Sequence, residues 1–218
     1  WWAGRQAQRE QPEGYTNSLD SFFPASIRTL LSGAGAENRV CSPLNVYMAL
    51  AMLAELTDGN SRAQILDCLG ATDINALRQQ ATALWNANYC DDGQLTSILA
   101  SSLWLNQDIP FVAETMERLA EVYHASSFQG PMGDDAFNKA LQDWINQQTG
   151  GLLAEQAAGL EMTPDTALAL ATTVYFRGHW HNEFSPSATA PGVFHAQDGD
   201  LDCDFMHQSD IRSLYTGA

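Results

Sequence analysis

The sequence predicts an α+β fold, and the order of its periodic segments is the first observation behind this prediction. Helical spacing of apolar residues comes first, then a segment that alternates with period two, then more helical segments, and finally short strand-like pieces. Helices and strands that are grouped in this way, without strict βαβ alternation, are typical of α+β proteins. The second observation is a long strand, Thr166–Arg177, whose two faces carry no charge before Arg177, so that both should be covered.

Six segments show the apolar periodicity of helices. Pro24 lies inside the first, and we expect that helix to start or bend there, because proline removes a hydrogen bond and clashes one turn back. The second has almost no charged residue and should be buried on most sides. The expected helices span Asn17–Leu31, Leu44–Leu56, Ser61–Leu69, Ile74–Tyr89, Phe111–Ala125 and Asp135–Gln148.

Two of these helices have recognisable N-termini. Ser42 followed by Pro43 predicts a helix start, because a serine hydroxyl caps a free amide and proline fits the first turn. The segment from Ser61 to Gln64 fits a capping box, which places the start of the third helix at Ser61.

The strands are expected from period-two alternation and from β-forming residues. In Thr166–Arg177 one face carries only small residues between Ala167 and Ala171, so a helix should pack closely on that side. The other expected extended segments are Asn38–Cys41, Leu95–Asn106, Val193–Ala196 and Leu201–His207.

Composition excludes several classes of protein. The 218 residues are 45% hydrophobic and 17% charged, which excludes an intrinsically disordered chain. Ten basic residues, of which Lys139 is the single lysine, against 26 acidic ones give a net charge of −16. Binding to nucleic acid needs clustered lysine and arginine, so neither nucleic acid nor an anionic membrane surface is an expected partner. No apolar segment is long enough to insert into a membrane.

Four cysteines lie far apart and form no C-x-x-C pair. Such spacing excludes a small disulfide-stapled scaffold, while three pairings stay open. Cys41 lies in an apolar run and Cys68 on an apolar helix face, which favours buried free thiols. The chain starts without methionine or a signal-peptide core, and both ends read as if cut from a longer product.

Four blocks of the sequence resemble the serpins, the serine protease inhibitor family, in family order and spacing. They match the family's Ser-Pro-Leu-Ser, Gly-x-Thr-x-x-Gln-Ile, Asn-x-Trp-Val-x-x-x-Thr-x-Gly-x-Ile and Asn-Ala-Ile-Tyr-Phe-Lys-Gly-x-Trp segments. The blocks are Asn38–Val46 continuing to Leu53, Gly59–Ile65, Asp143–Leu153 and Leu168–Phe184. The resemblance starts near Asn17 and implies a multi-helix plus β-sheet serpin-like fold that ends before the reactive loop and the C-terminal strands. It implies a poorly ordered lead at residues 1–14 and the N-terminal part of one domain at 15–218.

The resemblance also implies a function. In this family a protease cleaves the exposed reactive loop and is trapped as an acyl-enzyme when the cut loop inserts into the central sheet. Thr166–Arg177 would flank the gap that receives the loop, and the helix Asp135–Gln148 would cover the sheet and yield during insertion. The expected partner is a serine protease or a cysteine protease. The resemblance further implies no cofactor, a monomer when complete and an extracellular location; a non-inhibitory serpin with a binding or chaperone-like role is the alternative.

Two groups of residues match sites of the family. Ser42, Asn45 and Thr172 match the shutter, a set of polar residues under the sheet that hold it closed or let it part. This sequence departs from the family there, since serine is usual at Asn45 and asparagine at Thr172, so that an amide and a hydroxyl have exchanged places. Gly178, Trp180 and Phe184 match the breach, where the loop first enters. The residue that defines protease specificity lies outside this sequence. As ordinary structural alternatives, Ser42 is a helix cap, Thr172 a β-former, and Trp180 and Phe184 core aromatics.

The sequence disfavours metal binding and catalysis. His179, His181, His195, Cys203 and His207 share one stretch, yet the tight pairs of a zinc site are missing, so scattered surface histidines are the better interpretation. Cys41 and Ser42 lack the strained elbow of a nucleophile, and an enzyme is not expected.

Overall fold

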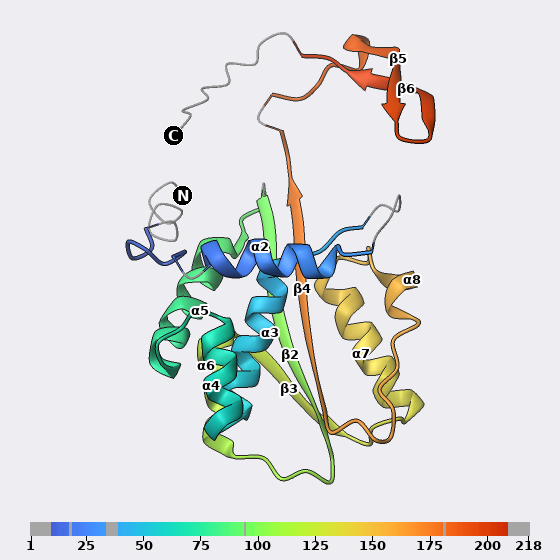
Figure 1. Ribbon diagram of the computed structural model, residues 1–218. Coiled ribbons are helices and arrows are strands. Elements are labelled where there is room, and N and C mark those ends of the chain that lie inside the picture. Colours follow the sequence, from blue (N-terminus) through green and yellow to red (C-terminus); the bar gives the residue numbers. More distant parts are fainter. Residues whose placement is uncertain (1–9, 18, 34–38, 94, 181, 209–218) are drawn as a thin grey trace.

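The computed structural model describes residues 10–17, 19–33, 39–93, 95–180 and 182–208 (Figure 1). The helices pack around a four-stranded sheet. Its central strand is β2, Leu95–Asn106, as expected from the alternation. β4, Leu168–Gly178, pairs antiparallel with β2 from Leu95 to Leu105. β1, Cys90–Asp91, and β3, Ala125–Gly130, share the opposite edge of β2. Among the described strands β4 pairs with β2 alone, so its second edge is open.

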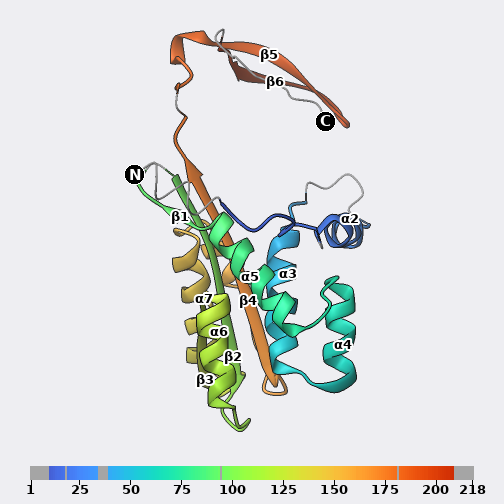
Figure 2. The same cartoon turned by 90° about the vertical axis from the view of Figure 1, so that its left-hand side faces the viewer.

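Helices cover both faces of this sheet. Figure 2 shows α3 on one side of β2 and β4 and α7 on the other. α3, α5 and α6 make contacts with one another on the α3 side. The helices are α2 (Leu19–Leu30), α3 (Pro43–Leu56), α4 (Gly59–Cys68), α5 (Ile74–Asn88), α6 (Ala113–Tyr123), α7 (Asp135–Gln148) and the short α8 (Ala154–Ala157).

Two apolar clusters hold these layers together. The larger lies on the α3 side and includes Leu99 and Leu103 of β2, together with Tyr47 and Met52 of α3. The smaller lies under α7 and centres on the buried Trp104. Because side chains alternate along a strand, odd-numbered residues of β2 face the first cluster and even-numbered residues face the second.

A hairpin follows β4 and lies beyond its carboxyl end (Figure 1). After a short 3₁₀ turn at Pro186–Ala188, β5 spans Thr189–Ala196 and pairs with β6, Gly199–Met206. Both strands extend further toward the N-terminus than expected. Apolar side chains of the hairpin are exposed in the described structure, among them Phe194 and Leu201.

The helix boundaries test the capping predictions. Ser42 caps α3 and Pro43 is its first residue, as predicted. The capping box at Ser61 is wrong: α4 starts two residues earlier, where the carboxylate of Asp58 accepts the amide of Gly59 at 2.7 Å. α2 does not start at Pro24 but runs through it.

Other expectations also need correction. Arg39–Cys41 belong to no strand, because a strand needs a pairing partner and the described chain offers none there; Asn38 lies outside the described residues. All four cysteines are free, but none is fully buried: Cys68 and Cys203 are exposed, and Cys41 and Cys90 are half-buried. The boundary at residue 15 stays a prediction, since residues 1–9 lie outside the described part; Tyr15 itself is tied to α5 through its carbonyl, which accepts Nε2 of Gln80 at 2.9 Å.

A buried carboxylate ties α3, α5 and α6 together. The side chain of Glu55, 1% exposed, accepts two hydrogen bonds from Arg78, at 2.7 and 2.8 Å. It also accepts the hydroxyl of Tyr123 at 3.1 Å, and Arg118 lies 3.6 Å away. The hydrogen bonds that Arg78 donates to Glu55 raise the pKa of Arg78, and burial, reinforced by Glu55, raises the pKa of Tyr123 far above its ordinary value.

Loss of this charge should destabilise the chain. Glu55→Gln keeps the shape but replaces charge-assisted bonds by neutral ones, which should lower the free energy of unfolding by about 1–3 kcal/mol. Urea unfolding followed by circular dichroism measures the effect, with the exposed Glu121→Gln on α6 as control. Equal stability of the two variants would contradict a structural role for this cluster.

An indole completes the edge of β2 between β1 and β3. Trp85 of α5 donates its Nε1–H to the carbonyl of Leu99 at 3.1 Å. Its ring stacks on Tyr89 and on His124, with centroids 4.5 and 3.7 Å apart. His124 is the left-handed residue that ends α6 (φ 50°), and burial lowers the pKa of its imidazole.

His124 should make stability depend on pH. Its pKa in the folded chain lies below the value of 6.5 expected when unfolded, so the unfolded state binds more protons between these two values. Stability should therefore fall as the pH drops below about 6.5. The wild type should lose more of its urea midpoint between about pH 7.5 and 5.5 than His124→Asn, which tolerates the left-handed conformation. If the urea midpoints of the wild type and of His124→Asn differed by the same amount at both pH values, the proposed contribution of His124 would be contradicted.

Candidate functional site

The three residues predicted as a shutter lie together between α3 and β4. The backbone amide of Asn45 donates to Oγ of Ser42 at 3.3 Å, which is the α3 cap. Nδ2 of Asn45 donates to the carbonyl of Thr172 at 3.2 Å, and Oγ1 of Thr172 donates to the carbonyl of Asn45 at 3.2 Å. A reciprocal pair of hydrogen bonds therefore joins the first turn of α3 to the middle of β4.

Local sequence rules explain how these residues meet. Ser42 and Pro43 set the start of α3, so that Asn45 falls in its first turn. Leu168 and Leu170 of β4 pack on the α3 cluster, and Thr172 is next on that face by strand alternation. The amide of Asn45 and the hydroxyl of Thr172 thereby bridge the two elements.

The register shows which way the backbone of Thr172 points. The amide of Asn106 donates to the carbonyl of Ala167 at 3.0 Å, so these residues form a hydrogen-bonded pair. Bonded and non-bonded pairs alternate in an antiparallel ladder, and the continuous register makes Ser101 and Thr172 a non-bonded pair. The carbonyl of Thr172 therefore points away from β2, toward the open edge, where the Asn45 amide holds it.

The residues predicted as a breach lie at the carboxyl end of β4. Gly178 is the last residue of the strand and pairs with Leu95. The rings of Trp180 and Phe184 meet edge to face with centroids 5.5 Å apart. Trp180 is 69% exposed and Phe184 is half-buried, so neither is a core aromatic in the described chain. The α3 face of β4 is also uncovered toward the carboxyl end of the strand, since Phe176 is 68% exposed, against the expectation that both faces are covered throughout.

The small-residue face of β4 receives α7, as predicted. Ala169 and Ala171 pack against the cluster that contains Trp144 and Ile145 of α7. The helix thus lies across the strand next to its open edge.

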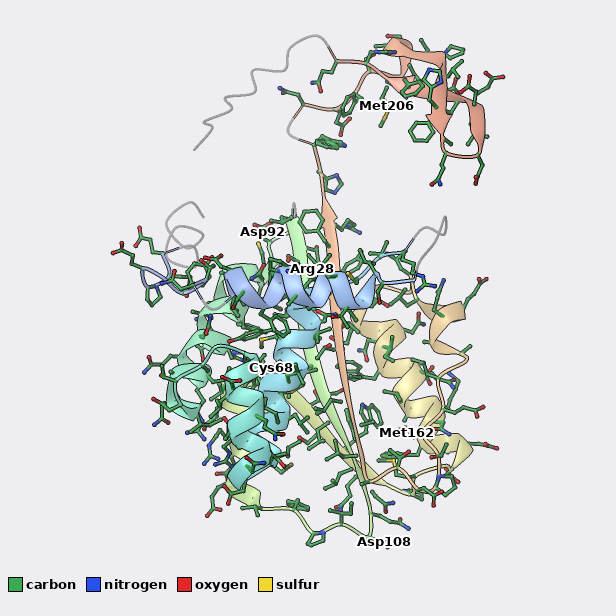
Figure 3. The ribbon with its side chains drawn as sticks, in the orientation of Figure 1. Arg28, Cys68, Asp92, Asp108, Met162 and Met206 are labelled. Carbon is green, nitrogen blue, oxygen red and sulfur yellow. The ribbon has the colours of Figure 1, made fainter. Side chains whose placement is uncertain are left out.

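The sequence did not predict the hydrogen bonds by which two side chains of α7 hold a distant segment of backbone. The buried Asn138 donates Nδ2–H to the carbonyl of Met162 at 3.3 Å and accepts the amide of Met162 at 2.8 Å. Gln142 adds a bond to the carbonyl of Leu160 at 3.0 Å. These side chains hold the segment between α8 and β4 beside α7, where Figure 3 shows Met162. The sequence offered one signal for this contact, an asparagine on the apolar face of an amphipathic helix. Its partner could not be predicted, because Met162 lies 24 residues away in a segment without regular secondary structure.

The described residues offer little for other chemistry. No group of three or more potential metal-ligating side chains comes together among them. Within the same ranges no helix is long and apolar enough to cross a membrane.

These elements together define an α+β protein in which, among the described strands, the edge strand β4 has one open edge, a polar bridge to α3 on one face and α7 on the other. Comparison with known proteins identifies its family. The profile of the serpin (serine protease inhibitor) family matches residues 19–216, and the chain belongs to this family.

Individual relatives are distant. Alpha-1-antitrypsin from Meriones unguiculatus is 28% identical over 187 residues, which are 82% of this chain and 45% of the relative. The native stressed conformation of Arabidopsis AtSerpin1 covers 88% of this chain with TM-score 0.74 at 23% identity, over 51% of its own length. Human thyroxine-binding globulin with its ligand gives TM-score 0.78 at 18% identity, over 89% of this chain and 54% of its own. The last two show the fold alone, and this chain spans about half the length of the relatives it matches.

The bridge between α3 and β4 should contribute measurably to stability. Thr172→Val keeps the shape of the side chain but loses the bond to the Asn45 carbonyl, which should lower the free energy of unfolding by about 1–2 kcal/mol. Thr172→Ser keeps the hydroxyl and should retain most of the bond energy. Urea unfolding of the two variants checks this; a valine variant as stable as the serine variant would mean that the bond contributes nothing.

Proposed function

We propose that this chain is the N-terminal part of a serpin that inhibits serine proteases as a suicide substrate, whose cleaved reactive loop inserts along the open edge of β4. The observation that carries the proposal is that β4 pairs with β2 alone among the described strands. Backbone groups on the free side of β4 lack a ladder partner, and an inserted strand would supply one.

The Asn45–Thr172 bridge would act as the closing element of that edge. An incoming strand needs the outward carbonyl of Thr172, which now accepts the Asn45 amide. A carbonyl oxygen has two lone pairs, so the strand must either share this oxygen or displace the amide. Insertion past the middle of β4 would then be coupled to the position of α3.

The other predicted residues take roles that follow from their position. Trp180 and Phe184, beyond the carboxyl end of β4, would form the region where the loop first enters. α7, packed on the small residues next to the open edge, would have to move as the strand is accommodated. Non-inhibitory serpin function is the second candidate, and it is favoured by the fold shared with thyroxine-binding globulin.

The proposal includes further expectations at the level of the family. The partner would be a serine protease, with a cysteine protease as second class, and the complete protein would act as an extracellular monomer without a cofactor. The segments that decide inhibition and specificity lie outside this sequence.

Protease complexes test the proposal directly. The complete protein should form an SDS-resistant, one-to-one complex with a trypsin-like or an elastase-like protease, with loss of protease activity. Residues 1–218 alone should form no such complex and should tend to aggregate through the free edge of β4. Cleavage of the complete protein without any complex, across both protease types, would instead support the non-inhibitory alternative. A chain 1–218 that is monomeric and blocks a protease would contradict the strand-insertion account.

A further inference from the structure

Two adjoining apolar hollows lie at the end of the sheet where β2 leads into α6. One, of about 220 Å³, lies between β2, α6 and β3, and the other, of about 300 Å³, lies between β2, α6 and the carboxyl end of α3. Leu105, Phe111 and Met116 line both hollows, so that together they form one groove, the Phe111 groove. Phe111 and the next residue, Val112, are 55% and 59% exposed. Exposed apolar side chains beside a hollow are typical of sites that bind another molecule.

Hydrogen bonds fix the segment that forms this groove. Gln129 of β3 donates Nε2–H to the carbonyl of Ile109 at 2.9 Å, and the amide of Ile109 donates to the carbonyl of Asn106 at 3.0 Å. Asn106 donates Nδ2–H to the carbonyl of Thr166 at 3.3 Å, and its Oδ1 accepts the amide of Asp108 at 3.0 Å. The segment is thus tied to β3 and to the start of β4. A groove that is already formed loses little conformational entropy when a ligand binds.

The rim of the Phe111 groove is acidic. Asp58, whose side chain is 95% exposed, lines the groove at the end of α3. Asp108 directly precedes the lining residues 109–112, and Glu114 is next to the lining residue Thr115; both acidic residues are exposed. Figure 3 shows Asp108 at this end of the sheet. Carboxylates around an apolar groove favour a ligand that carries positive charge.

The nearby arginines are committed to other partners. Arg78 and Arg118 face the buried carboxylate that joins α3, α5 and α6. Arg62 of α4 donates to two carbonyls at the end of α3 and lies 3.7 Å from the carboxylate of the α4 cap. Within the described ranges, neither Asp108 nor Glu114 has a salt-bridge partner. Most of the negative charge of the rim is therefore available to a ligand.

We propose that the Phe111 groove binds a segment of a partner protein in which large apolar side chains are flanked by lysine or arginine. An apolar side chain would enter the groove beside Phe111, since buried aromatic contacts dominate the energy of many interfaces. The basic residues would meet the acidic rim. In the sheet β2 separates the hollow next to β3 from the open edge of β4, so this site is distinct from the place where an added strand would pair. The proposal does not depend on protease inhibition.

Binding of a synthetic peptide to the complete protein tests the proposal. The probe is a fluorescein-labelled amphipathic peptide of leucine and lysine, and the control is its counterpart of leucine and glutamate. Fluorescence anisotropy should show saturable binding of the lysine peptide, with the glutamate peptide at least about ten-fold weaker. Phe111→Ser should weaken binding of the lysine peptide about ten-fold or more, because it removes the apolar contact without changing the charge. Asp108→Asn combined with Glu114→Gln should weaken it roughly three- to ten-fold, with a smaller effect at high salt.

Matched substitutions outside the groove separate a specific site from general attraction to an acidic protein. Phe176→Ser removes another exposed phenylalanine and Glu121→Gln another exposed carboxylate, and both should leave the affinity unchanged. An equal effect of Phe111→Ser and Phe176→Ser would overturn the proposal, as would the absence of any binding of the lysine peptide. Equal affinity for the two peptides would overturn the assignment of a basic partner. These measurements involve no protease, so a failure here is distinct from a failure of the proposed function.

Discussion

The antiparallel pairing of β4 with β2 is the constraint on which the rest of this structure depends. Its register decides which backbone groups of β4 are used by the sheet and which face the open edge. The same pairing turns the leucines of β4 toward α3 and its alanines toward α7. A shift by one residue would exchange the two faces, and the large apolar side chains would then meet α7.

Hydrogen bonding is distributed unevenly around this sheet. Where α3, α5 and α6 meet, Glu55 uses both carboxylate oxygens in bonds to Arg78 and accepts Tyr123 as well. In the middle of β4, by contrast, Thr172 and Asn45 exchange two hydrogen bonds between neutral groups, each 3.2 Å long. Side-chain hydrogen bonds therefore tie the helical layer on the α3 side together, while β4 is joined to α3 by the Asn45–Thr172 bridge.

Much of the architecture could be predicted from local patterns. The bounds of β2 and α7 follow from periodicity, and the start of α3 follows from Ser42 and Pro43, because each signal lies within a few residues. The start of α4 was mistaken because two capping signals compete there and Asp58 takes precedence over Ser61. β3 was missed because Ala125–Gly130 is short and polar, and parallel pairing with β2 holds it in the sheet.

The sequence by itself determined most of the helical and extended segments and the uncharged faces of β4, and its family resemblance predicted a shutter at Ser42, Asn45 and Thr172. These are properties of spacing and residue type, which act over one or two turns of chain. Only the tertiary structure decided that the Thr172 carbonyl faces an open edge and that Asn45 holds it from 127 residues away. Such facts depend on register and on contacts between distant segments, because a hydrogen bond forms only when folding brings both groups to within about 3 Å.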